Sequence, residues 1–194
     1  MTVQLAMTSP LTLVPPMSIE LDDHAVLRTG HAGDAEQIHA LIMEHLEEGH
    51  LLPRQVEELR VHAARFIVAE RAGRVMACAE LAPLGNGVAE VRSLVVHRDA
   101  REGGLGRRLV SELLRMARLE EYRELCAFSH TPAYFVRMGF SIVPHTWVPE
   151  KIAVDCHRCP LFRKCGQSAV VLSLAGSRAP RRAAGPGGPA AGRG

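Results

Sequence analysis

Short apolar runs separated by turn-forming residues fill the middle of this chain. Residues 65–70, 75–81 and 88–96 are rich in apolar side chains, and each run has about the length of a buried strand. Ala72-Gly73 and the segment 83–87 separate the runs, and both contain residues that favour turns. We therefore predict three strands joined by tight turns, as in an antiparallel meander.

A helical period appears on either side of this meander. Between Asp34 and Gly49 apolar residues recur every three or four positions, which predicts an amphipathic helix. Asp34 with Gln37 three residues later resembles a capping box at the start of that helix. Shorter helices are expected at residues 56–61 and 132–138, the second of which begins with a proline.

The segment after residue 96 joins a strand to a helix through glycines. Its turn reads Arg101-x-x-Gly104-x-Gly106. The apolar face of the helix that follows consists of Leu109, Val110, Leu113, Leu114, Met116 and Ala117. Glycine lets backbone N–H groups approach a ligand, and a helix N-terminus offers unpaired donors and a positive dipole end. This predicts a phosphate or pyrophosphate site, with a tight surface turn as the simpler alternative; the spacing fits neither the dinucleotide-binding fingerprint nor the P-loop.

The two ends of the chain differ from the middle. Residues 1–23 contain three prolines and no sustained period, so we expect a flexible leader. Residues 175–194 are mostly Gly, Pro, Ala and Arg, a composition typical of a disordered tail. Further strands are expected at residues 24–29, 124–128, 140–143 and 169–174. The chain should therefore form one domain at residues 24–174.

Composition narrows the functional classes. The chain has 194 residues, 47% hydrophobic residues and a formal net charge of +2, so it can bury a core and has no strong bias towards nucleic acid. No apolar run approaches the ~20 residues that span a bilayer, and the N-terminus lacks the pattern of an export signal. Five cysteines, an odd number, do not suggest a secreted disulfide framework. We expect a cytoplasmic protein with no membrane or nucleic-acid partner.

The glycine turn and its flanking elements resemble one enzyme family. Arg101-x-x-Gly104-x-Gly106 is similar to the (Gln/Arg)-x-x-Gly-x-(Gly/Ala) turn of the GNAT acyltransferases, which grips the pyrophosphate of coenzyme A. Other strings resemble GNAT-type N-acetylglutamate synthases, namely residues 51–54, 89–94, 131–135, 138–140 and 148–151. The segment 155–165 resembles the short, stand-alone bacterial members. The resemblance covers residues 25–174 and implies an α/β GNAT acyltransferase fold, with a mixed, mostly antiparallel sheet flanked by helices.

This resemblance implies acetyl-CoA as the acetyl donor. Backbone groups of Leu94, Val95 and Val96 would pair with its pantetheine arm and polarise the thioester carbonyl. Arg101 and Arg107 would add positive charge near the pyrophosphate. The N–H groups that would hold the pyrophosphate belong to Glu102, Gly103, Gly104, Leu105, Gly106 and Arg107.

Acetyl transfer to an amine also needs a route for protons. The resemblance implies Glu90 as the base, acting through a water molecule; a salt-bridged strand glutamate is the alternative. Many GNAT enzymes place a proton-donating tyrosine four residues before the Gly of the Gly-Phe pair, where this chain has Phe135. Tyr134, one residue earlier, should face another way on its helix. The synthase-like members suggest a hydroxyl on the preceding segment, so Ser129 is the candidate acid, with Thr131 behind it; a turn residue at a strand end is the alternative role for Ser129.

The resemblance further implies L-glutamate as the acceptor and N-acetylglutamate, made for arginine biosynthesis, as the product. The two carboxylates of glutamate need cationic partners, and the candidates are Arg54, Arg92 and Lys151. The alternatives are a GNAT enzyme for another small amine or a protein N-terminus, and a non-catalytic module that binds acyl-CoA as a sensor. A small-molecule amine is the expected partner, and a homodimer is compatible with this interpretation.

One cysteine cluster has ligand-like spacing. Cys156, Cys159 and Cys165, with His157 between them, offer three thiolates and an imidazole to a zinc ion. The cluster is compressed compared with zinc fingers, which show two separated pairs, and reduced cysteines in a loop are the alternative. No metal site is assigned.

Overall fold

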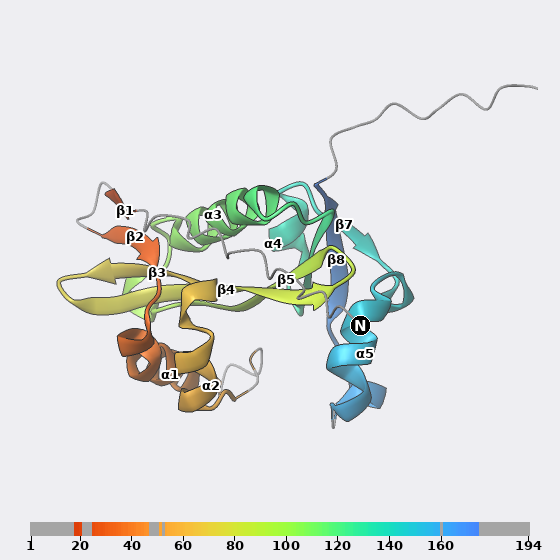
Figure 1. Ribbon diagram of the computed structural model, residues 1–194, viewed down its shortest axis with the longest axis horizontal. Coiled ribbons are helices and arrows are strands. Elements are labelled where there is room, and N and C mark those ends of the chain that lie inside the picture. Colours follow the sequence, from red (N-terminus) through yellow and green to blue (C-terminus); the bar gives the residue numbers. More distant parts are fainter. Residues whose placement is uncertain (1–17, 21–24, 47–50, 52, 160, 175–194) are drawn as a thin grey trace, which may run out of the picture.

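One mixed sheet runs through the computed structural model, which describes residues 18–20, 25–46, 51, 53–159 and 161–174. The sheet has eight strands in the order β1-β2-β3-β4-β5-β6-β8-β7 (Figure 1). Neighbouring strands are antiparallel except β5 and β6, which are parallel. The strands are β1 (Ser18–Glu20), β2 (Val26–Thr29), β3 (Phe66–Arg71), β4 (Arg74–Gly85), β5 (Val88–Val96), β6 (Glu124–Ser129), β7 (Ser141–Val143) and β8 (Ser168–Ser173). The predicted fold class is confirmed.

The predicted meander is also confirmed. β3 and β4 form a hairpin around Ala72 and Gly73, whose φ angles of 49° and 76° are those of a tight turn. β5 has the predicted bounds, whereas β4 continues four residues beyond its predicted end. β1 lies within residues 1–23, which were expected to be a flexible leader, and it pairs with β2 as an ordered edge strand. The rest of that leader and the expected tail at 175–194 lie outside the described residues.

Helices cover both faces of the sheet (Figure 1). α1 (Ala35–Glu44) and α2 (Val56–Val61) lie on one face, and α3 (Leu105–Leu119) and α4 (Pro132–Val136) lie on the other. α5 (Pro149–Val154), which was not predicted, follows β7 and contacts β4. None of the helices in the described ranges is long and apolar enough to cross a membrane.

The predicted apolar face of α3 anchors this helix to the sheet. Leu109, Val110, Leu113 and Ala117 are completely buried and pack in one cluster with residues of β3, β4 and β5. Burying one such side chain contributes roughly 1.5–3 kcal/mol. Since α3 and β5 are held together in this way, the glycine turn between them has a fixed position.

The start of α1 differs from the prediction. Asp34 makes no capping hydrogen bond to α1; its carboxylate accepts from the N–H of His31 (2.8 Å) and pairs with Arg28 (2.7 Å). The capping box instead opens a short 3-10 turn, Ala32–Asp34, that precedes α1. Gln37 accepts a hydrogen bond from the N–H of Val75 on β4 (2.9 Å). The predicted Asp34–Gln37 box is therefore wrong, because both side chains serve partners that lie elsewhere.

A β-bulge interrupts β5 at Ser93. Glu80 on β4 pairs with Arg92, and Cys78 pairs with Val95, so β5 carries one extra residue between these pairs. Ser93 has a φ of 51°, which is uncommon for a residue other than glycine. A bulge bends its strand and redirects the side chains on either side. This one separates the part of β5 that carries the candidate base from the part that carries the candidate thioester contacts.

Candidate active site

A cleft opens where β5 and β6 separate. Their parallel pairing joins residues 88–90 to residues 124–126, and both strands continue beyond it to Val96 and Ser129. The cleft between them has a volume of about 740 Å³. Its cofactor half is lined by Leu94, Val95, Val96, Arg101, Gly106 and Tyr134. Its acceptor half is lined by Arg54, Glu90, Arg92, Lys151, Asp155 and Arg158.

The end of β5 presents backbone groups to the cofactor half. The N–H of His97 donates to the carbonyl of Met76 beside β4 (2.8 Å). Since backbone groups alternate in direction along a strand, those of Val96 face away from β4, towards the gap left by β6. The Val96 carbonyl accepts a hydrogen bond from Nε of Arg101 (3.2 Å). The N–H of Val96 points the same way and suits an extended ligand or a carbonyl oxygen.

The predicted glycine turn lies at the N-terminus of α3. Gly104 is the N-cap with a φ of 74°, and Glu102 has a φ of 71°. A Cβ on Gly104 would meet no atom within 4 Å, so glycine is favoured there by its backbone angle. Gly104 has no side chain to cap the first turn, so the N–H groups of Leu105, Gly106 and Arg107 suit an anion. This geometry fits the pyrophosphate of acetyl-CoA.

Tyr134 faces the cofactor half, and the expectation that it faces another way is wrong. A Cβ built on Gly106 would lie 2.9 Å from the Tyr134 hydroxyl. This hydroxyl is buried and has no hydrogen-bond partner within the described part of the chain. Burial raises its pKa, although Arg107 and Arg137 oppose this, so it is protonated at neutral pH and can donate. The helical period alone did not reveal its direction, because α4 has five residues and its tilt depends on packing.

Ser129 also lines the cleft, at the end of β6. Its Oγ accepts a hydrogen bond from the N–H of Thr131 (3.0 Å) and lies 3.3 Å from Oγ1 of Thr131. These contacts belong to a turn residue, while its position is that of a cleft hydroxyl. Both interpretations of Ser129 therefore have support in the geometry.

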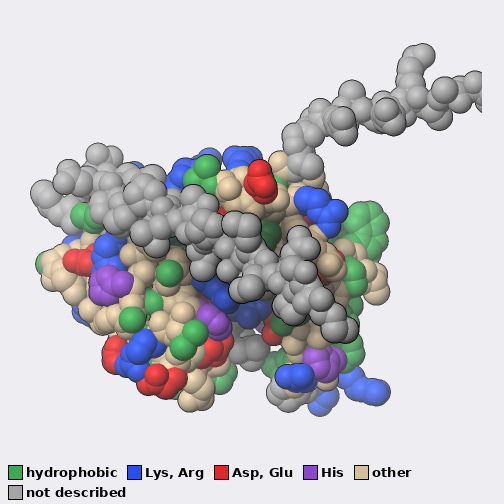
Figure 2. Space-filling model, in the orientation of Figure 1, with side chains coloured by type: hydrophobic (Ala, Val, Ile, Leu, Met, Phe, Trp, Pro, Cys, Tyr) green, Lys and Arg blue, Asp and Glu red, His purple; other side chains and the backbone are tan. Residues whose placement is uncertain are grey.

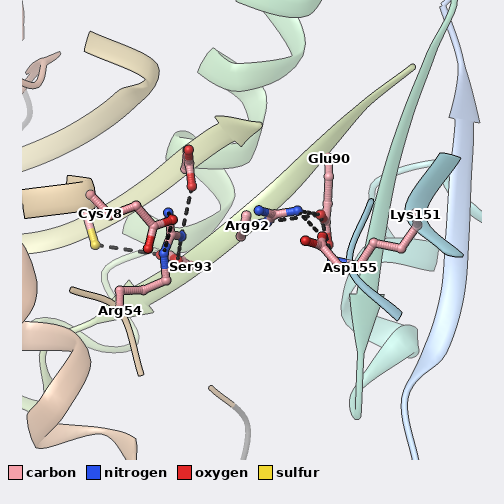
Figure 3. A network of polar contacts seen from close by, with 9 residues as sticks. Arg54, Cys78, Glu90, Arg92, Ser93, Lys151 and Asp155 are labelled. Carbon is pink, nitrogen blue, oxygen red and sulfur yellow. Dashed lines mark hydrogen bonds and ion pairs between the residues drawn. The ribbon is translucent and has the colours of Figure 1, made fainter. Parts of the chain in front are cut away.

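Glu90 belongs to a network of four charged side chains in the acceptor half (Figure 3). Lys151 Nζ lies 2.8 Å from Oε1 of Glu90, and Arg92 Nη2 lies 2.6 Å from Oε2. Both cations also pair with Asp155, and Glu90 is 4% exposed. Burial opposes ionisation of Asp155, but the hydrogen bond from Lys151 and the charges of both cations keep its pKa below the usual value. The two negative and two positive charges balance, so the network can stay buried.

Arg54 is also engaged with protein carboxylates (Figure 3). Its Nη1 donates to Oε2 of Glu80 (2.9 Å) and to Oγ of Ser93 (3.0 Å), and its Nη2 donates to Glu58 (2.7 Å). Burial lowers the pKa of Arg54, but Glu58 and Glu80 more than offset this and hold it above the usual value. Arg54 thus lines the cleft, and its structural partners are ones that the sequence did not reveal.

The structure brings most of the predicted site residues to this cleft. Leu94, Val95, Val96, Arg101, Gly106, Glu90, Ser129, Arg54, Arg92 and Lys151 line it. The other five belong to the glycine turn or to the first turn of α3: Glu102, Gly103, Gly104, Leu105 and Arg107. In Figure 2, Lys and Arg side chains gather at the centre of this face, between the part that carries α1 and α2 and the part that carries α5.

Sequence reasoning missed Asp155, Tyr134 and Arg158 as lining residues. The spacing of Lys151 and Asp155, four residues apart on and just after α5, is a signal that a prediction of α5 would have exposed. Arg158 lies on the loop after α5 and has no comparable signal in the sequence.

The three clustered cysteines line the acceptor half. Cys156 and Cys159 share a 3-10 turn, in which the N–H of Cys159 donates to the carbonyl of Cys156 (3.0 Å). Both are free thiols, as is Cys165. Within the described ranges, no group of three or more His, Cys, Asp or Glu side chains is arranged to hold a metal ion.

Comparison with known proteins agrees with this site. An uncharacterized N-acetyltransferase of Chlorobaculum tepidum is 32% identical over 148 residues, which are 76% of this chain and 96% of that protein. The amino-acid acetyltransferase of Neisseria meningitidis is 33% identical over 157 residues, 80% of this chain but 35% of that protein. This chain thus corresponds to about a third of the longer relative.

Solved structures of acetyltransferases are similar to this chain as well. The N-acetylglutamate synthase from Neisseria gonorrhoeae, complexed with coenzyme A and N-acetyl-glutamate, has a TM-score of 0.70 and 30% identity, covering 77% of this chain and 35% of that chain. The sequence pattern of the acetyltransferase (GNAT) family matches residues 34–140, which include the glycine turn and all of β5, β6 and α3. The cleft, the turn and these matches agree, and the chain belongs to the acetyltransferase (GNAT) family, whose acetyl donor is acetyl-CoA.

Proposed function

We propose that this acetyltransferase acts on the α-amine of L-glutamate and forms N-acetylglutamate for arginine biosynthesis in the cytoplasm. The observation that carries the proposal is the acceptor half of the cleft, where Arg54, Arg92, Lys151 and Arg158 line the space beside Glu90. Guanidinium and ammonium groups are the partners that the two carboxylates of such an acceptor need. The similarity to amino-acid acetyltransferases and to a synthase complexed with N-acetyl-glutamate supports the same acceptor.

The cofactor half fits acetyl-CoA, which supplies the acetyl group as a thioester. The first-turn N–H groups of α3, from Leu105 to Arg107, would hold the pyrophosphate, with Arg101 adding positive charge nearby. The backbone of Leu94, Val95 and Val96 would hold the extended arm and polarise the thioester carbonyl. These residues orient the donor so that its carbonyl faces the acceptor half.

Glu90 is proposed as the base that receives the proton of the amine. Both of its carboxylate oxygens already contact a cation, Lys151 or Arg92. An amine therefore reaches Glu90 more readily through a bridging water molecule than by direct contact. The same cations lie close to where the α-carboxylate of an amino acid would enter, so base and substrate contacts share one network.

Two hydroxyl groups can return a proton to the leaving sulfur. Ser129 is the candidate from the sequence, and Tyr134 is the candidate from the structure. Tyr134 has the stronger geometric support, because its hydroxyl is buried beside the cofactor half without a described partner. Ser129 already accepts a hydrogen bond from Thr131.

Rescue of a bacterial arginine auxotroph that cannot make N-acetylglutamate tests the proposed function. Expression of the 194-residue chain should restore growth without arginine. Expression of a Glu90→Gln variant at the same level should restore it poorly, because the base is lost. If the wild-type chain is expressed, folded and binds acetyl-CoA but gives no rescue, the acceptor is another amine.

A further inference from the structure

The cations of the acceptor half differ in whether they already hold a carboxylate. Arg54, Arg92 and Lys151 each pair with two carboxylates of the protein. A substrate carboxylate that approaches one of them must displace a partner or add a third negative charge. Such displacement weakens the net gain from binding. These three cations alone therefore recognise a dicarboxylic acceptor poorly.

Arg158 is different. Its Nε donates to Nε2 of His157 (3.0 Å), and among the residues that the structure describes it contacts no carboxylate side chain. Arg158 is exposed and lines the acceptor half. With Nε engaged, the two terminal nitrogens of its guanidinium remain as a planar fork that matches a carboxylate.

His157 positions this guanidinium. Its Nδ1 lies 3.4 Å from the carbonyl of Ile152, a residue of α5. An imidazole nitrogen that accepts a hydrogen bond from Arg158 carries no proton, so the two contacts fit the tautomer that has its proton on Nδ1. Arg158 is thereby tied through His157 to the helix that carries Lys151.

We propose that Arg158 binds the side-chain carboxylate of the acceptor and so makes the enzyme selective for a dicarboxylic amino acid. This rests on the proposed function. The amine must reach the part of β5 near Glu90, and the α-carboxylate, one carbon from the amine, then lies near Arg92 and Lys151. The side-chain carboxylate extends further, towards the exposed loop after α5, where Arg158 offers a cation without a protein carboxylate.

Steady-state kinetics with glutamate and glutamine test this proposal, because glutamine has nearly the same shape but no side-chain charge. In Arg158→Ala the KM for glutamate should rise about 10-fold, the effect of losing one charged hydrogen-bonded contact. The KM for glutamine, the KM for acetyl-CoA and kcat at saturating glutamate should stay within twofold of wild type. Arg158→Lys should recover part of the loss, since an ammonium is charged but not bidentate.

Arg163→Ala is the matched control, since Arg163 is an exposed arginine of the same loop that does not line the cleft. Its KM for glutamate should equal that of wild type. His157→Ala should raise the KM for glutamate without changing kcat, and His157→Gln, which keeps an acceptor for Arg158, should recover part of the loss.

The outcomes separate this proposal from the proposed function. If the wild type prefers glutamate and Arg158→Ala keeps the full preference over glutamine, Arg158 is not the selector, while the proposed function stands. If Arg158→Ala raises the KM for glutamate and the KM for glutamine equally, the role of Arg158 is structural and the proposal is overturned. If the wild type shows no preference for any dicarboxylic acceptor, the proposed function and the role of Arg158 both fail.

Discussion

Replacing Arg54 by alanine should destabilise the fold before it reveals anything about substrate. Arg54 neutralises Glu80, whose side chain is 1% exposed and lies 2.9 Å from Nη1 of Arg54. Removing one partner of a buried ion pair costs about 3–5 kcal/mol, because the other charge stays buried and uncompensated. Glu58 is 41% exposed, so it can turn to water and adds only about 0–1 kcal/mol. We therefore expect the free energy of unfolding to fall by about 3–5 kcal/mol in Arg54→Ala.

Urea denaturation measures this loss, with an unchanged slope as the sign that a single transition is being compared. Glu58→Ala is the matched control and should cost less than about 1 kcal/mol. The double variant Arg54→Met/Glu80→Met replaces the pair by apolar side chains, which is often neutral. It should therefore be more stable than Arg54→Ala, and its KM for glutamate then measures any substrate role of Arg54 in a folded protein.

One result would refute this reasoning, and the KM for glutamate decides what Arg54 does. Unchanged stability in Arg54→Ala would mean that the Arg54–Glu80 pair does not form in solution. If such a variant also raised the KM for glutamate at least 10-fold, Arg54 would be free to bind substrate. A normal KM for glutamate in the double variant would instead exclude Arg54 as a substrate anchor.

Three further predictions concern the catalytic cleft. Gly106→Ala places a Cβ 2.9 Å from the Tyr134 hydroxyl, so calorimetry should show at least ~10-fold weaker binding of acetyl-CoA. Adding Tyr134→Phe should restore part of that affinity, whereas unchanged binding in Gly106→Ala would mean that this turn does not hold the cofactor. Glu90→Gln should keep acetyl-CoA affinity and lose about 10²-fold in turnover. This loss of turnover should be smaller at high pH, where more of the amine is neutral, and normal turnover would remove Glu90 from the mechanism. Tyr134→Phe should reduce kcat more than Ser129→Ala does, and the reverse order would favour Ser129 as the acid.

Local patterns predicted the elements of this fold well. The bounds of α2 and β5 agree with the prediction. The spacing of apolar residues and the turn-forming residues that set these bounds lie within a few positions of each other in the sequence. The glycine turn was found for the same reason, since strand, turn and helix follow one another in the sequence. The cap of α1 was predicted wrongly, because Asp34 is paired with Arg28 on a neighbouring strand and the sequence carries no sign of that contact.

The candidate site was less accessible from sequence, because its charges are paired over long distances. Arg54 forms an ion pair with Glu80, 26 residues later, and Lys151 forms one with Glu90, 61 residues earlier. The bulge at Ser93 redirects β5 through a backbone angle that serine rarely adopts, so no residue preference announced it. Residue types at the site could thus be proposed from the sequence, whereas their partners required the fold.

A competition experiment tests the central claim most directly. The purified chain is supplied with acetyl-CoA and all twenty amino acids at equal concentration, and the acetylated products are identified by mass spectrometry while release of the coenzyme A thiol is followed in parallel. We predict that N-acetylglutamate is the main product and that its amount matches the thiol released. A different N-acetyl amino acid as the main product, or thiol release that requires no glutamate, would contradict the account.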